Sequence, residues 1–135
     1  MDTDIRTAIE LLEALASSNE KLTKLAQLVR GQHEVIRVVN SLECRKYLTG
    51  SMLEGYVDAE LRNGKALCWY LEVRWSDASW IIDTQILIND SEGQVTAHQF
   101  ENRTAYTLQE FLKLFDEAVE ELTQFDGLRL GITEV

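Results

Sequence analysis

The spacing of hydrophobic residues changes twice along the chain. Between residues 5 and 29, apolar side chains recur every three or four positions, the period of one face of an α-helix. From residue 51, apolar and polar residues alternate, which is the period of a strand with one buried face. The pattern predicts an α+β fold. It consists of N-terminal helices over about residues 4–48, a four-stranded antiparallel meander over about residues 51–100, and an amphipathic helix over residues 107–125 packed on the apolar sheet face.

The N-terminal helical region contains one expected break and one ambiguous segment. Residues 17–20, Ser-Ser-Asn-Glu, have the composition of a helix start, so we expect one helix to end and a second to begin there. Residues 32–48 are rich in β-branched side chains, which fit a strand as well as a helix. The spacing of Val35, Val38 and Leu42 favours a helix, and a strand is the alternative.

Short turn sequences between the predicted strands fix how the strands pair. Loops of three or four residues place Val57 opposite Trp69, and Trp69 opposite Ile86. A further turn places Ile86 opposite Ala97. Apolar side chains then meet on one face of the sheet, so we expect Trp69, Leu71 and Ile86 at the centre of the core.

The same register arranges polar residues in rows on the other face. One row contains Glu54, Glu72 and Asp83, with neighbouring Cβ atoms about 5 Å apart. This face is either the solvated side of a one-faced sheet or a recognition surface, because tyrosines among fixed charges are typical of binding surfaces. The candidate partner-binding residues on it are Glu54, Tyr56, Asp58, Tyr70, Glu72, Asp83, Gln85, His98 and Phe100.

Composition and charge narrow the function classes. The chain is 45% hydrophobic and 27% charged, as in a soluble globular domain, so we expect a single domain over residues 1–135. The net charge is -10. Residues 1–50, the helical part, carry equal numbers of acidic and basic side chains, and the whole excess of acid lies in the sheet-and-helix part, residues 51–135. This charge argues against a nucleic-acid partner, and no apolar stretch is long enough for a membrane span.

Few residues are candidates for binding a metal or a redox cofactor. The N-terminus is acidic rather than basic, so a secretory signal is not expected. The two cysteines, Cys44 and Cys68, lack the spacing of metal or redox motifs. We therefore expect a cytoplasmic protein that binds no metal and no other cofactor.

One short pattern points towards an enzyme. Asp58 and the tripeptide Glu72-Val73-Arg74 lie on two predicted strands joined by a hairpin. Over about 17 residues this arrangement resembles the metal-binding Asp and Glu-x-Lys elements of the PD-(D/E)xK nucleases. The resemblance implies magnesium-dependent nucleic-acid cleavage. The chain departs from the family pattern by having Arg74 at the position of the Lys and a further strand after the motif.

Three function classes remain open. The first is a non-catalytic acidic interaction module, such as an inhibitor, an immunity-type protein or an adaptor, that binds a basic protein partner through the polar sheet face. The second is a small acidic chaperone or assembly factor that forms a homodimer through its N-terminal helices. The third is a divalent-metal-dependent enzyme that uses Glu54, Glu72 and Asp83. The charge layout favours the first class.

Overall fold

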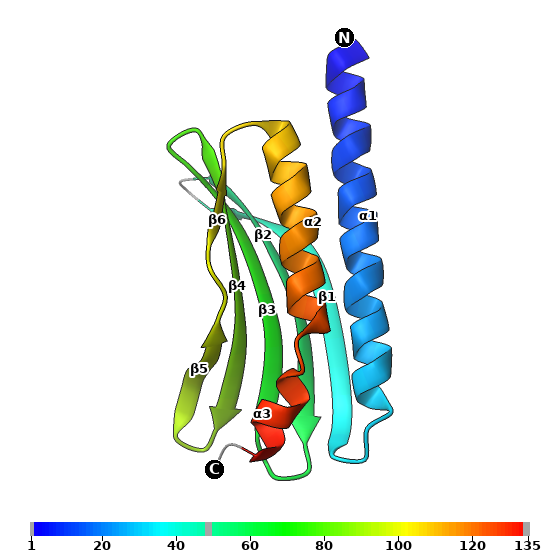
Figure 1. The fold of residues 1–135 in the computed structure, drawn as a ribbon, viewed down its shortest axis with the longest axis vertical. Coiled ribbons are helices and arrows are strands. Elements are labelled where there is room, and N and C mark those ends of the chain that lie inside the picture. Colours follow the sequence, from blue (N-terminus) through cyan, green and yellow to red (C-terminus); the bar gives the residue numbers. More distant parts are fainter. Residues whose placement is uncertain (1, 48–49, 134–135) are drawn as a thin grey trace.

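The computed structural model describes residues 2–47 and 50–133 of the chain. A long helix is followed by six strands and two further helices (Figure 1). These elements are α1 (Asp2–Arg30), β1 (Val35–Tyr47), β2 (Gly50–Leu61), β3 (Ala66–Ser76), β4 (Ser79–Asp90), β5 (Gly93–Gln99), β6 (Arg103–Ala105), α2 (Leu108–Gln124) and α3 (Gly127–Thr133).

The strands form one antiparallel sheet in the order β1-β2-β3-β4-β5, and β6 pairs with β4. The predicted meander is confirmed for β2 to β5. The predicted register holds from β2 to β4, since Val57 faces Trp69 and Trp69 faces Ile86. The sheet nevertheless has six strands rather than four, because β1 joins one edge and the short β6 joins the other.

Residues 35–47 form strand β1, so the prediction of a helix over this segment is wrong. Val38 is 6% exposed and Val39 is 47% exposed, which is the alternation of a one-faced strand. β1 pairs along its length with β2, from Val35 opposite Leu61 to the far end of both strands. That partner lies later in the sequence, so a tertiary interaction outweighs the local helical spacing.

α1 is one continuous helix of 29 residues, so the predicted break at residues 17–20 is wrong. Ser18 is 2% exposed and faces the interior instead of capping a second helix. Leu22 and Leu25 continue the same buried stripe. Serine and asparagine cost a helix only about 0.5 kcal/mol each, and the packing of this stripe offsets that cost.

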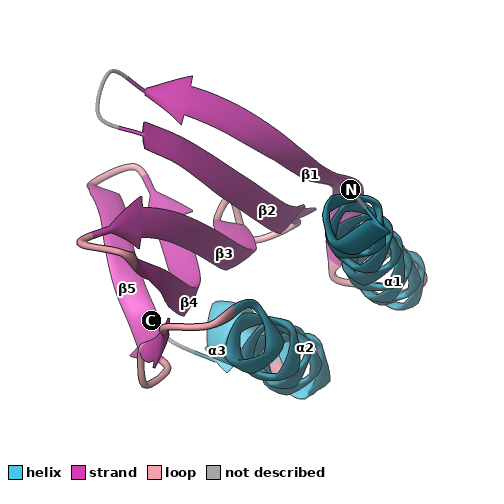
Figure 2. Cartoon of the chain, turned by 90° about the horizontal axis from the view of Figure 1, so that it is seen from above, coloured by secondary structure: helices cyan, strands magenta, loops and turns pink. Residues whose placement is uncertain are grey.

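α1 and α2 lie side by side on one face of the sheet, and no helix of the described residues covers the other face (Figure 2). The predicted α2 is confirmed, with the Thr107 hydroxyl accepting a hydrogen bond from the Glu110 N–H at 3.1 Å. Lys21 connects the two helices. Its Nζ atom lies 2.8 Å from Asp116 Oδ1 and 2.8 Å from Glu120 Oε2.

The core lies between the sheet and these helices. Trp69 is 1% exposed and Leu71 and Ile86 are fully buried, which confirms the predicted centre of the core. Trp69 Nε1 donates a hydrogen bond to the Phe125 carbonyl at 3.2 Å, just before the chain turns into α3. Residues 128–132 alternate between apolar and other residues, which favours a short edge strand, but they form part of helix α3 instead. Over the described ranges, no helix is both long and apolar enough to cross a membrane.

Candidate functional site

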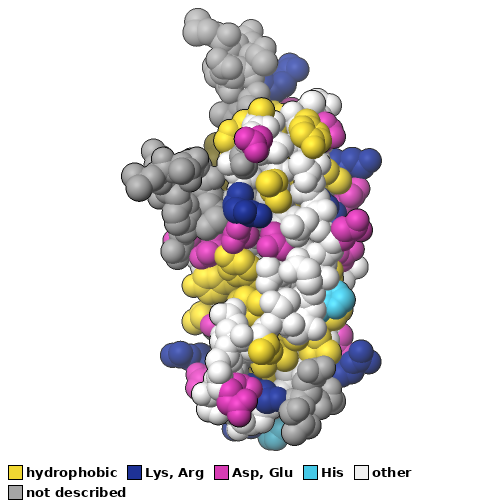
Figure 3. All heavy atoms as spheres, turned by 90° about the vertical axis from the view of Figure 1, so that its left-hand side faces the viewer, with side chains coloured by type: hydrophobic (Ala, Val, Ile, Leu, Met, Phe, Trp, Pro, Cys, Tyr) yellow, Lys and Arg dark blue, Asp and Glu magenta, His cyan; other side chains and the backbone are white. Residues whose placement is uncertain are grey.

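The uncovered face of the sheet carries a row of four carboxylates. Glu43 of β1 pairs with Glu54 of β2, Glu54 pairs with Glu72 of β3, and Glu72 pairs with Asp83 of β4. Glu43 is missing from the sequence prediction because its segment was expected to be helical. Acidic side chains form a band across this side of the molecule, with side chains of the hydrophobic class, which includes tyrosine, directly below it (Figure 3).

Tyr70 bridges two of these carboxylates. Its hydroxyl lies 2.8 Å from Glu54 Oε2 and 3.0 Å from Glu72 Oε2, so one phenolic proton is shared between two acceptors. Burial raises the pKa of Tyr70, and the hydrogen bonds to Glu54 and Glu72 and their negative charges raise it further. Tyr70 is therefore a neutral donor at physiological pH and reduces the repulsion between the two glutamates.

Neighbouring side chains hold the other oxygens of the row. Arg74 Nε lies 3.0 Å from Glu72 Oε1. Asp83 accepts hydrogen bonds from Gln85 Nε2 at 2.9 Å and from Gln99 Nε2 at 2.7 Å. Glu54, Glu72 and Asp83 are thus stabilised in part by side chains of the same chain.

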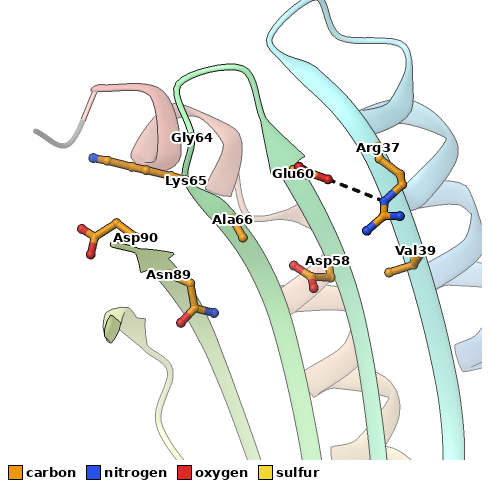
Figure 4. A pocket seen from close by; sticks show the side chains of 9 residues that line it. All are labelled: Arg37, Val39, Asp58, Glu60, Gly64, Lys65, Ala66, Asn89 and Asp90. Atoms are coloured by element: carbon orange, nitrogen blue, oxygen red, sulfur yellow. Dashed lines mark ion pairs between the residues drawn. The ribbon is translucent and has the colours of Figure 1, made fainter. Parts of the chain in front are cut away.

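Asp58 differs from these carboxylates. It stands in a hollow of about 380 Å³ between β1 and β4, close to the hairpin that joins β2 to β3 (Figure 4). Within the described residues no hydrogen bond or ion pair reaches its carboxylate. The hollow is lined by Arg37, Val39, Asp58, Glu60, Gly64, Lys65, Ala66, Asn89 and Asp90.

The charges around Asp58 leave its carboxylate able to bind a cation. Burial raises the pKa of Asp58, whereas Arg37 lowers it and Glu60 raises it. Arg37 is itself turned towards Glu60, with Nε 3.6 Å from Oε2 at the rim of the hollow (Figure 4). A half-buried carboxylate with apolar Val39 and Ala66 beside it fits the stem and the charged end of a lysine or arginine side chain.

A second hollow of about 470 Å³ lies on the same face towards β5. It is lined by Tyr70, Gln85, Leu87, Gln94, Val95 and Thr96.

Cys68 pairs with Asp58 on one side and with Leu87 on the other. Burial, with the nearby Asp58 and Glu54 charges, raises the pKa of Cys68 to about 12, so this thiol is a poor nucleophile.

Seven of the nine candidate residues lie on the uncovered face, and two do not. The seven are Glu54, Tyr56, Asp58, Tyr70, Glu72, Asp83 and Gln85. The placement of His98 and Phe100 on this face is wrong. The register shifts between Ile86 and Leu87, so that Ile86 pairs with His98 rather than with Ala97.

This shift turns His98 and Phe100 towards the helix-covered face. The His98 ring stacks on Phe125 with centroids 4.6 Å apart, and it meets Phe100 edge-on at 4.5 Å. Phe100 is 7% exposed. Both side chains therefore belong to the packing beneath the end of α2, and alternation of residue types alone does not reveal a one-residue bulge.

The carboxylates are not arranged as a metal centre. Among the described residues, no group of three or more His, Cys, Asp or Glu side chains could hold a metal ion. Asp58 pairs with Cys68, four residues along β3 from Glu72, a separation of about 13 Å at 3.3 Å per residue. Metal–oxygen bonds are about 2.0–2.6 Å long, so Asp58 and Glu72 do not share an ion as the PD-(D/E)xK resemblance implies.

Comparison of the chain with protein-family models, with curated proteins and with solved structures finds no match. The function is therefore argued from the geometry of the uncovered face.

Proposed function

We propose that the chain is a non-catalytic interaction module that binds a basic protein partner through the uncovered face of its sheet. The observation that carries this proposal is the half-buried Asp58 carboxylate in an open hollow, without a hydrogen bond from the described residues. A lysine or arginine of the partner would enter this hollow and form a charge-assisted hydrogen bond with Asp58.

The rest of the face supports the same kind of partner. Glu54, Glu72 and Asp83 present negative charge from fixed positions, because Tyr70 and the glutamine amides hold their side chains. The net charge of -10 would attract a basic protein over a distance and speed its association at low salt. Tyr56 and Tyr70 add large side chains of low conformational entropy, which are common in binding surfaces.

A peptide selection tests the proposal, because it does not require the partner itself. A displayed library of random peptides is selected on the purified chain, and the affinities of the enriched peptides are then measured by fluorescence anisotropy. We expect the enriched sequences to contain Lys or Arg. Their affinity should fall at least about tenfold for Asp58→Asn, because the peptide cation would lose its charged acceptor.

Glu117→Gln is the matched control, since Glu117 is exposed on α2 and the substitution also removes one negative charge. Affinity for this variant should stay within about twofold of wild type. Peptides without basic residues, or equal losses in the two variants, would show that general charge or another surface is responsible and would contradict the proposal.

A second candidate function, a small dimeric chaperone or assembly factor, draws support from α1. Ile9 is 48% exposed and Leu12 is 65% exposed in the N-terminal half of this helix, whose first turns extend past α2 (Figure 1). The helical region expected after residue 20 consists of the second half of α1 and strand β1, so a helix-mediated homodimer would depend on α1 alone. Leu12→Glu should abolish suppression of client aggregation under this candidate and leave peptide binding at Asp58 unchanged.

A further inference from the structure

β1 is an outer strand of the sheet and is long for that position. It has 13 residues, whereas proteins commonly keep edge strands short or covered because their unpaired N–H and C=O groups can pair with another chain. α1 accompanies only the first part of β1, and the strand then runs away from the helix (Figure 2). The opposite side of the sheet is different, since β5 and β6 divide the edge of β4 between them.

The backbone groups that face outward can be identified. The Val38 carbonyl accepts a hydrogen bond from Arg30 Nη2 at 3.3 Å, and this side chain comes from α1 rather than from β2. In an antiparallel ladder a residue directs its N–H and C=O to the same side, and successive residues alternate. Val38, Asn40 and Leu42 therefore present their backbone groups to the open edge.

We propose that β1 pairs antiparallel with β1 of a second copy about a two-fold axis through Asn40. Val38 of each copy then faces Leu42 of the other, and the two Asn40 residues face each other. The three outward residues of each copy exchange about six backbone hydrogen bonds in this arrangement. The result is one continuous sheet across a symmetric dimer.

The charges of β1 select this register. On the uncovered face it brings Arg37 of each copy opposite Glu43 of the other, so the dimer gains two cross-strand ion pairs. A shift of the register by two residues in one direction places Arg37 opposite Ser41, and a shift in the other direction places it opposite Arg45. The first loses both ion pairs and the second opposes like charges, so of these three registers only the one about Asn40 pairs opposite charges.

Side chains on both faces fit this arrangement. The Arg37 side chain is 75% exposed, and its contact with Glu60 is 3.6 Å long, so the remaining guanidinium N–H groups can reach Glu43 of the second copy. On the helix-covered face, Asn40 Nδ2 lies 3.4 Å from Thr23 Oγ1. The axis thus brings the two α1 helices together near Thr23, whose short side chain allows the approach of about 8–10 Å found between packed helices.

Arg30 controls access to this edge. Its hydrogen bond to the Val38 carbonyl occupies a group that would otherwise accept from the N–H of Leu42 in the second copy. Arg30 must turn away for the strands to pair, which opposes association, and the short interface adds little buried area. The dimer is therefore weak and forms at roughly micromolar or higher concentrations.

Charge reversal tests the register. Sedimentation equilibrium of the full chain over about 1–300 µM should give a monomer–dimer equilibrium for wild type. Arg37→Glu and Glu43→Arg should each raise the dissociation constant at least about tenfold, because each places like charges opposite one another. The double variant Arg37→Glu/Glu43→Arg restores both pairs and should return to within about threefold of wild type.

Substitutions at Asn40 test the backbone pairing separately. Asn40→Pro removes an N–H that faces outward, so the monomer should keep its sheet, as measured by circular dichroism, and lose the dimer. Asn40→Ala keeps this N–H and is the control that should still dimerise. Arg30→Ala frees the Val38 carbonyl and should lower the dissociation constant at least about threefold.

Two results would overturn the proposal. One is a monomer at every concentration for both wild type and Arg30→Ala. The other is a dimer that survives Asn40→Pro in a folded chain, or that Leu12→Glu abolishes while both charge reversals leave it intact. The second result would place the interface on α1.

Discussion

At the residue scale, the carboxylates of the uncovered face fall into two groups. Tyr70 and Arg74 satisfy Glu72, and glutamine amides satisfy Asp83, whereas no side chain of the described residues binds Asp58. The sequence predicted three of the four carboxylates in the row, Glu54, Glu72 and Asp83, because strand register aligns residue positions. It did not predict which carboxylate is held by its neighbours, because this depends on how far each side chain reaches.

Tyr70 should make the stability of the chain sensitive to alkaline pH. Its pKa is raised in the folded chain, so its contribution to stability is complete below the ordinary tyrosine pKa of about 10 and is lost as pH rises towards the folded value. Urea unfolding of wild type and Tyr70→Phe between pH 8 and 11 measures this. The stability advantage of wild type should shrink above about pH 10, and an advantage that is constant over this range would contradict the shift.

Cys68 should resist alkylation. At pH 8 a thiol with a pKa of about 12 is ionised roughly a thousand times less than an ordinary thiol of pKa about 8.5. In a Cys44→Ser variant, in which Cys68 is the sole thiol, iodoacetamide should react about a thousandfold more slowly in the folded chain than in urea. The mass-spectrometric rate should rise about tenfold per pH unit. A folded-state rate within tenfold of the unfolded one would contradict the assignment.

At the element scale, alternation and short turns were sufficient to predict β2 to β5, including the pairing of Trp69 with Ile86. They were insufficient for β1, because its β-branched residues suit two structures and the edge of β2 decides between them. They also missed the one-residue shift in β5, which reverses the face of His98. Local patterns therefore predict hairpins well and long-range pairing poorly.

The junction between α2 and α3 should tolerate no added methyl group. A Cβ at Gly127 would lie 3.0 Å from the Trp69 ring, which is fixed in the core, so Gly127→Ala should cost about 1–3 kcal/mol of unfolding free energy. Gly31→Ala is the control, since its Cβ would lie 3.6 Å from the Leu28 carbonyl oxygen, an ordinary contact. It should change stability by less than about 0.5 kcal/mol in urea titration. Equal effects of the two variants would contradict this packing.

At the scale of the whole molecule, the neutral first part and the acidic second part are interleaved rather than separate. α1 supplies Lys21 to Asp116 and Glu120 of α2, and β1 supplies Arg37 to Glu60 of β2. The charge-neutral first part, α1 and β1, thus lies beside the acidic second part: α1 lies next to α2, and β1 forms one edge of the sheet. The excess negative charge then concentrates on the uncovered face and on the outer surface of α2.

α1 has a first part that contributes little to stability and a second part that packs against the core. Among its described side chains, Leu11 is the first that packs against the core and Ser18 the first that is buried, while the earlier turns extend past α2 (Figure 1). Deleting residues 1–10 should therefore change the free energy of unfolding by less than about 1 kcal/mol, because little apolar surface is lost from the core. Leu22→Ala should instead cost about 2–5 kcal/mol, since Leu22 is fully buried beneath the helix. Urea titration at one low protein concentration compares both variants with wild type. A loss above about 2 kcal/mol on truncation would mean that the first turns of α1 stabilise the chain through a contact outside this core, and the division of the helix argued here would be wrong.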